Sequence, residues 1–174
     1  MVSVVLSLGS NLGDQYFYIC QMEKALRTIL KGTLARSDLM KTEPVGVKDQ
    51  LWFLNRIISG SFDGTARQLL ESTRHIEESL GREKKGQMAS RTADIDILLF
   101  GEQIINDADL IVPHPRMLWR RFCIEGMNQI VPQWRVPGTE MSVSQHFKQM
   151  SPQLRAQRIF ISHEKGSDCS DGRP

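Results

Sequence analysis

The chain has 174 residues, of which 40% are hydrophobic and 24% are charged, and these values are typical of one soluble domain with a sizeable core. Its formal net charge of +2 is too small to favour nucleic acid or an anionic membrane as a bulk partner. Three widely spaced cysteines without a CxxC pair, and the lack of a long apolar segment, predict a cytoplasmic protein with no disulfide framework, no zinc site and no membrane span.

The N-terminal part of the chain predicts a strand, a helix and two further strands. Apolar and small side chains alternate over residues 2–9, which is typical of a strand. Asp14 follows a turn and is placed to cap a helix, which we expect to end at Gly32. Further strands are predicted around residues 33–41 and over residues 52–62, on either side of a loop that contains proline and glycine.

A second helix has clear signals at both ends. Thr65 and Gln68 have the spacing of a capping box at its start, and Gly81 stands just beyond its end. Its buried stripe is predicted to consist of Leu69, Thr73, Ile76 and Leu80.

Residues 91–100 predict the next strand and contain the most informative residues of the chain. Because side chains alternate along a strand, Asp94 and Asp96 are expected to share one face. That face would also carry Leu98 and Phe100. The opposite face would consist of Ala93, Ile95, Ile97 and Leu99. The order strand, helix, strand, strand, helix, strand predicts an α+β fold, namely a ferredoxin-like βαββαβ sandwich.

The C-terminal part has weaker signals and is predicted to add to this fold. We expect a short strand at 104–105, an extended proline-containing segment at 112–115, a helix over 117–130 and a short helix within 144–150. One domain over residues 1–161 is therefore predicted, followed by a flexible tail over residues 162–174.

Asp94 and Asp96 are the first candidates for chemistry. Two like charges about 6–7 Å apart along one strand repel each other, so a positive partner is expected. A pair of divalent cations such as Mg²⁺ is a natural partner, because hard cations bind carboxylate oxygens together with substrate phosphates. An exposed sheet edge with solvated acids is the alternative.

Basic side chains flank the two acids in the sequence. They are Arg82, Lys84, Lys85 and Arg91 before the acids and Arg116, Arg120 and Arg121 after them. Acids and cations together match the triphosphate of a nucleotide and favour phosphoryl transfer, which needs positioning and charge stabilisation more than a covalent catalyst. A solvated run of charges is the alternative. The chain contains no P-loop, no kinase glycine-rich motif and no nucleophile elbow.

Residues 91–98 resemble the signature of the 6-hydroxymethyl-7,8-dihydropterin pyrophosphokinase family. Further blocks are similar to this family and come in the same order: residues 8–14, residues 42–46 with Gln50 and 53–55, Glu77 with 80–82, and residues 112–114 with Arg120 and Phe122. The resemblance implies transfer of the β,γ-pyrophosphoryl group of ATP to the pterin hydroxymethyl oxygen in folate biosynthesis, with AMP as the other product. It agrees with the α+β ferredoxin-like fold.

The resemblance also assigns roles to residues. Asp94 and Asp96 would hold two Mg²⁺ ions, and the catalytic residues would be Arg82, Arg91, Asp94 and Asp96. ATP would be bound by Arg74, Glu77, Lys84, Arg91, Ile97, Leu110, Ile111, His114, Pro115 and Arg120. The pterin would be bound by Thr42, Glu43, Pro44, Val45, Phe53, Asn55, Asp94 and Phe122, with its ring stacked between Phe53 and Phe122. The implied partners are small-molecule substrates, without nucleic acid or membrane, and the enzyme would be a monomer.

The chain departs from the family pattern in a few places. The loop over residues 86–90 lacks the tryptophan that is common there, and Arg74, Met40 and Pro115 replace other residue types. Core packing is the alternative role for Phe53 and Phe122. Two other functions stay open: a nucleotidyl- or glycosyltransferase that uses the Asp-x-Asp pair, and a non-catalytic nucleotide-binding ferredoxin-like domain.

Overall fold

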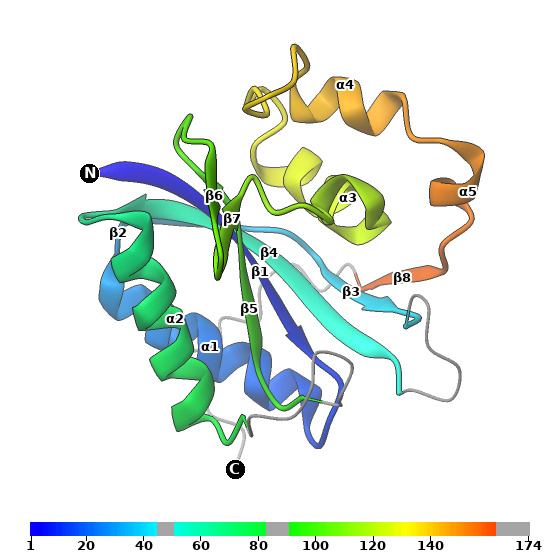
Figure 1. The fold of residues 1–174 in the computed structure, drawn as a ribbon. Coiled ribbons are helices and arrows are strands. Elements are labelled where there is room, and N and C mark those ends of the chain that lie inside the picture. The colour runs from blue at the N-terminus through cyan, green and yellow to red at the C-terminus, as the bar shows by residue number, and fades with distance from the viewer. Residues whose placement is uncertain (45–50, 83–90, 163–174) are drawn as a thin grey trace.

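The computed structural model describes residues 1–44, 51–82 and 91–162. They form a six-stranded antiparallel sheet with helices on both faces, and a separate two-stranded sheet of residues 105–107 and 110–112 (Figure 1). The elements are β1 (Val2–Ser10), α1 (Gln15–Ile29), β2 (Leu30–Arg36), β3 (Leu39–Thr42), β4 (Phe53–Phe62), α2 (Ala66–Ser79), β5 (Asp94–Phe100), β6 (Ile105–Asp107), β7 (Leu110–Val112), the 3-10 helix η1 (Met117–Trp119), α3 (Arg121–Ile130), α4 (Val143–Lys148), α5 (Pro152–Arg155) and β8 (Ile159–Ser162). The fold is therefore mixed, with helices and an antiparallel sheet, as the sequence predicts.

The sheet has the strand order β5-β1-β4-β3-β8, and β2 also pairs with β4. All of these pairings are antiparallel. Helices α1 and α2 cover one face and share a core with inward-facing residues such as Leu6 and Leu69. Helices α3 and α4 cover the other face, where Val5, Ile57 and Met127 belong to a second core (Figure 1). Because β1 lies inside the sheet, between β5 and β4, its side chains contribute to a core on each face.

The local signals for the first two helices are confirmed. The Asp14 side chain accepts a hydrogen bond from the backbone N–H of Phe17 at the start of α1, and Thr65 and Gln68 form the full capping box of α2. Gly81 has φ +81°, as expected for a glycine after a helix.

The prediction for Gly32 is wrong. Helix α1 ends at Ile29, and Gly32 lies inside β2 with φ +74°. The pairing of β2 with β4 shifts register between Lys31 and Ala35, so this glycine serves an irregularity in a strand and not a helix end. The single strand predicted around residues 33–41 is divided into β2 and β3.

The predicted faces of β5 hold only up to Leu98. Val5 pairs with Leu99, whereas its neighbour Leu6 pairs with Ile97. Leu98 is therefore an extra residue of β5 without a partner in β1, as in a β-bulge. Beyond this bulge the faces are exchanged. Leu99 packs on the side of α3, and Phe100 packs under α1 and α2, the reverse of the prediction.

The C-terminal part differs from prediction in four elements. The helix expected over residues 117–130 is broken at Arg120, whose extended backbone (φ −114°, ψ 112°) separates η1 from α3. The short helix α5 and the strands β7 and β8 are not predicted as elements, and β8 includes Ser162, which the prediction assigns to the tail. The rest of the predicted tail, residues 163–174, lies outside the described residues. None of the described helices is long and apolar enough to cross a membrane.

Candidate active site

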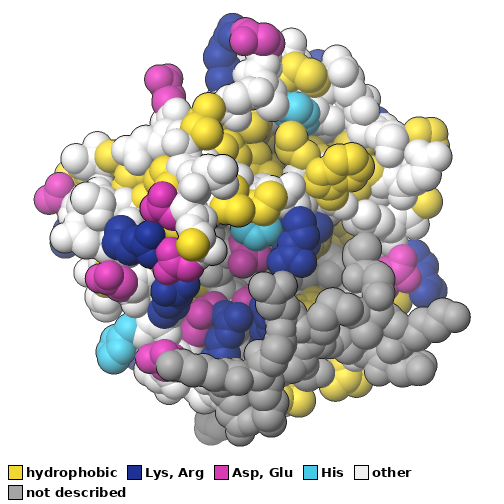
Figure 2. All heavy atoms as spheres, viewed as in Figure 1, with side chains coloured by type: hydrophobic (Ala, Val, Ile, Leu, Met, Phe, Trp, Pro, Cys, Tyr) yellow, Lys and Arg dark blue, Asp and Glu magenta, His cyan; other side chains and the backbone are white. Residues whose placement is uncertain are grey.

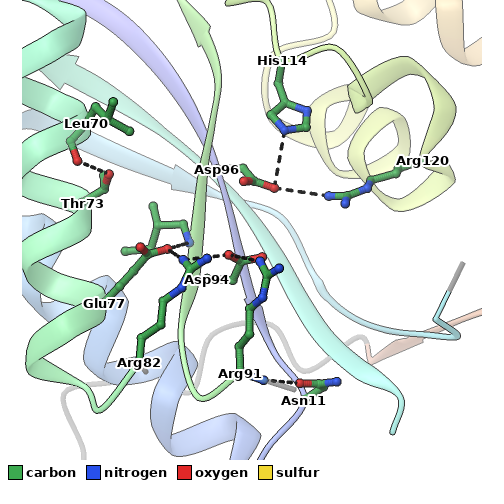
Figure 3. A network of polar contacts seen from close by, with 11 residues as sticks. Asn11, Leu70, Thr73, Glu77, Arg82, Arg91, Asp94, Asp96, His114 and Arg120 are labelled. Carbon is green, nitrogen blue, oxygen red and sulfur yellow. Dashed lines mark hydrogen bonds and ion pairs between the residues drawn. The ribbon is translucent and has the colours of Figure 1, made fainter. Parts of the chain in front are cut away.

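The two aspartates of β5 lie on the face of the sheet that α3 covers (Figure 3). Asp94 pairs across the sheet with Gly9, and Asp96 pairs with Ser7. The prediction that both carboxylates share a face is therefore confirmed. They belong to two neighbouring groups of polar contacts, one around each carboxylate.

Asp94 is held by two arginines. Its Oδ1 lies 2.7 Å from Nη1 of Arg91 and 2.9 Å from Nη1 of Arg82. Arg91 is itself fixed by Asn11, whose Oδ1 accepts the backbone N–H of Arg91 at 2.7 Å and whose own N–H donates to the Arg91 carbonyl at 3.0 Å. Asn11 is fully buried, so the turn after β1 positions the arginine that precedes β5.

Glu77 of α2 connects this group to the helix. Its Oε1 accepts the backbone N–H of Ile95 at 2.6 Å and pairs with the Arg82 guanidinium. Burial raises the pKa of Glu77 to about 7, against the lowering effects of Ile95 and Arg82. Burial also raises the pKa of Asp94, and the charge of Asp96 raises it further, although Arg91 and Arg82 oppose the rise. Both shifts reflect a group of acids with little access to water.

Asp96 contacts residues from the C-terminal part of the chain. Its Oδ2 lies 3.2 Å from Nη1 of Arg120 and 3.8 Å from Nε2 of His114. Burial lowers the pKa of His114, although the charge of Asp96 opposes this shift. The extended backbone at Arg120, which breaks the predicted helix, is the point from which this side chain reaches Asp96 (Figure 3).

The charges of this site balance. Three carboxylates, Glu77, Asp94 and Asp96, contact three guanidinium groups, those of Arg82, Arg91 and Arg120. On the face seen in Figure 2, acidic and basic side chains are intermixed below an apolar area. When all six described groups are ionised, each guanidinium already has a carboxylate partner, so an anionic triphosphate would need additional cations to bind there.

The donor set fits a divalent cation that is shared with a ligand. Within the described residues, no group of three or more His, Cys, Asp or Glu side chains is placed to hold a metal alone. Asp94 and Asp96 supply hard oxygen ligands on one face, and the arginine contacts above fall on only one oxygen of each carboxylate. This chemistry suits Mg²⁺, which is usually bound by one or two carboxylates together with phosphate oxygens.

Several of the residues assigned to the pterin lie near Asp94 in the sheet. Gly9 pairs with Asp94 on one side and with Asn55 on the other, and Nδ2 of Asn55 donates to Oγ1 of Thr42 at 2.8 Å. Phe53 lies near Gly9 and is half-buried. The structure thus brings four of these assigned residues, Thr42, Phe53, Asn55 and Asp94, to one end of the sheet.

The remaining pterin residues lie on two other elements. Phe122 belongs to α3, is half-buried and lies 6.0 Å from the guanidinium carbon of Arg120. Glu43 pairs with Arg158 at 2.7 Å, and Pro44 follows it. Val45 lies outside the described residues.

The residues assigned to ATP are more dispersed than those around the acids. Arg74 contacts Asp109 at 3.3 Å in the turn between β6 and β7. Leu110 is buried, Ile111 is 43% exposed and Pro115 is exposed. The Ile97 side chain packs in the core under α1 and α2, on the face of β5 opposite to Asp96. Lys84 lies outside the described residues.

Three contacts near the site were missed from the sequence. Asn11 positions Arg91, Asp109 pairs with both Arg67 and Arg74, and Arg158 pairs with Glu43. Only Asn11 has a signal in the sequence, because it stands in the glycine-rich turn after a predicted strand.

Known proteins are similar to this chain over most of its length. A family model described as 7,8-dihydro-6-hydroxymethylpterin-pyrophosphokinase (HPPK) matches residues 5–132. The chain is 38% identical over 160 residues to a 2-amino-4-hydroxy-6-hydroxymethyldihydropteridine pyrophosphokinase of Bacillus subtilis, covering 91% of this chain and 96% of that protein. It is 34% identical over 171 residues to the folic acid synthesis protein fol1 of Pneumocystis carinii, covering 97% of this chain but only 23% of that protein.

Solved structures share the fold. One structure of the HPPK-DHPS of Plasmodium falciparum matches 94% of this chain and 51% of its own chain with a TM-score of 0.70 and 15% identity. The wild-type form matches 84% of this chain and 44% of its own, with a TM-score of 0.64 and 13% identity. The chain therefore spans about half the length of these structures or less.

Proposed function

Because this chain belongs to the 7,8-dihydro-6-hydroxymethylpterin-pyrophosphokinase family, we propose that it transfers the β,γ-pyrophosphoryl group of ATP to 6-hydroxymethyl-7,8-dihydropterin in folate biosynthesis. The pterin hydroxymethyl oxygen would form a bond to the β-phosphorus and lose its proton, and the bond from the β-phosphorus to the α-phosphate would break to release AMP. The members of this family are enzymes, and the chain covers 96% of its Bacillus subtilis relative.

The observation that carries this proposal is the group of three carboxylates and three guanidinium groups at one end of β5. Asp94 and Asp96 are the residues that would hold two Mg²⁺ ions, which when bound would neutralise the triphosphate and lower the pKa of a bound hydroxyl. Arg82 and Arg91 would then turn from Asp94 to the phosphates, where they stabilise the charge of the transferring group.

The other assigned residues are proposed to bind the two substrates. Around ATP, Arg120 and His114 would contact phosphates from the side of Asp96, and Glu77 would hold Arg82 in reach. The nucleoside would lie toward Arg74, Ile97, Leu110, Ile111 and Pro115, and Lys84 is assigned to the same substrate. The pterin would stack between Phe53 and Phe122 and would be bound at its edge by Thr42, Glu43, Pro44, Val45 and Asn55.

We also propose that the core of the sheet is the ferredoxin-like arrangement. The order β5-β1-β4-β3 supports it, if β2 and β3 together take the place of one strand. A single domain over residues 1–161, a monomeric state and a cytoplasmic location complete the proposal.

The test is an assay of the purified protein with ATP, Mg²⁺ and 6-hydroxymethyl-7,8-dihydropterin in which AMP and ADP are separated. We expect equal amounts of AMP and of a pterin diphosphate, and no AMP when the pterin is omitted. ADP as the product would mean that a different bond is broken. ATP binding without turnover would favour a non-catalytic nucleotide-binding domain, and turnover with another acceptor would favour a nucleotidyl- or glycosyltransferase.

A further inference from the structure

Gly9 lies in the middle of a row of side chains that crosses the sheet. In this row Asp94 of β5 pairs with Gly9 of β1, Gly9 pairs with Asn55 of β4, and Asn55 pairs with Met40 of β3. Residues that are paired across neighbouring strands point to the same face. The row therefore places a carboxylate and a carboxamide on the two sides of a position that has no side chain.

The space above Gly9 is closely bounded. A Cβ atom on Gly9 would lie 3.0 Å from Oδ1 of Asn55, 3.8 Å from Cβ of Asp94 and 3.9 Å from Cδ1 of Phe53. The first distance is shorter than ordinary van der Waals contact, so a methyl group there would push the carboxamide of Asn55. Gly9 has no left-handed backbone conformation that would require glycine. Glycine is therefore important here because it leaves the space above it open, and not because the backbone conformation requires it.

Asn55 is held in one orientation beside this space. Its Nδ2 donates to Oγ1 of Thr42 at 2.8 Å, and both residues are buried. The atom of the carboxamide nearest to Gly9 is therefore the acceptor Oδ1. A ligand that enters above Gly9 meets an acceptor from β4 and an acid from β5, which suits a flat group with N–H donors along one edge.

We propose that Gly9 is a specificity-determining residue of the acceptor site: its missing side chain leaves a slot between Asn55 and Asp94 that admits the donor-bearing edge of a flat heterocycle. This inference rests on the proposed function, in which the heterocycle is the pterin. Thr42 is then a positioning residue, because it acts through the Asn55 carboxamide. Phe53 would bound the slot on a third side, since its Cδ1 lies 3.9 Å from the position of a Cβ on Gly9.

The main test is Gly9→Ala, with Gly60→Ala as its matched control. Gly60 also lies in the sheet, where a Cβ would meet Cδ2 of Leu34 at 2.8 Å, a flexible side chain outside the proposed site. We expect Gly9→Ala to raise the KM for the pterin about tenfold or more, since one methylene group in a closed site changes discrimination by about this factor. The KM for ATP should stay unchanged. Gly60→Ala should leave both KM values unchanged, even if its unfolding midpoint falls.

A second variant keeps the test decisive if Gly9→Ala does not fold. Thr42→Val retains the size of the side chain but removes the acceptor for Nδ2 of Asn55, so the carboxamide can rotate and pterin binding should weaken. Binding of 6-hydroxymethyl-7,8-dihydropterin is measured directly in the presence of α,β-methylene-ATP, which cannot transfer the group. Unchanged pterin affinity in both variants would overturn this inference. It would not affect the proposed function, which wild-type turnover tests. Wild-type protein that neither binds nor converts the pterin would overturn both this inference and the proposed function.

Discussion

Glu77 is expected to make the stability of the protein depend on pH. Its side chain is only 7% exposed, and burial raises its pKa from an ordinary value of 4.5 to about 7. Between pH 4.5 and about 7, the Glu77 carboxyl is therefore more protonated in the folded protein than in the unfolded chain. Because the native state binds more protons in this window, the free energy of unfolding should fall as the pH rises from 4.5 through 7.

The size of the effect follows from the pKa. A difference of about 2.5 between the folded and unfolded pKa values corresponds to about 3 kcal/mol, at 1.36 kcal/mol for each pKa unit. Glu77→Gln should remove this contribution, because a neutral amide can still accept the N–H of Ile95 but does not ionise. The variant should therefore gain stability relative to wild type as the pH rises, by up to about 3 kcal/mol at pH 8.

The assay is urea unfolding of the metal-free protein at several pH values from 4.5 to 8, with free energies obtained by linear extrapolation. Glu78→Gln is the matched control, because Glu78 is the next residue of α2 and is exposed. We expect the difference between the Glu77 variant and wild type to grow with pH and the Glu78 difference to stay constant. Parallel curves for wild type and Glu77→Gln would refute this account of the buried acid.

Three further substitutions give distinct outcomes. Asp96→Ala should abolish turnover but leave the circular dichroism spectrum unchanged, because it removes a proposed metal ligand and a like charge beside Asp94; measurable turnover would contradict the metal role. Arg82→Ala should lower the single-turnover rate more than the affinity for ATP, since Arg82 is proposed to meet the phosphates mainly in the transition state; a defect in ATP affinity alone would argue against this. Gly126→Ala should destabilise the protein by about 1–3 kcal/mol in thermal unfolding, because its Cβ would overlap Cγ1 of Ile57; an unchanged midpoint would show that α3 can shift away from the sheet.

Local signals in the sequence predicted local structure well. The caps at Asp14 and Thr65 depend on hydrogen bonds between residues three positions apart, so the sequence contains both partners. The shared face of Asp94 and Asp96 follows from the two-residue period of a strand. The family resemblance then gave these residues a chemical role, and the family comparison supports the reaction.

The errors occurred where a distant segment decides the local structure. The bulge at Leu98 exists because β5 pairs with β1, and it exchanged the faces of the following residues. The strand β8 is only four residues long and is formed by pairing with β3. Its isoleucine and phenylalanine residues favour a strand, but the run is too short to predict one by itself. Helical periodicity continues through Arg120, and the break there was visible only in the folded chain.

The sequence by itself therefore determined the types and approximate limits of the main elements, the acidic pair and the family, because these depend on short-range periodicity, caps and motifs. Only the tertiary structure decided which charged groups meet. Arg82, which follows α2, and Arg120, which precedes α3, reach the two aspartates of β5, and the space above Gly9 arises from three strands at once. Such contacts join residues that are far apart along the chain, and the packing of the sheet and helices is what brings them together.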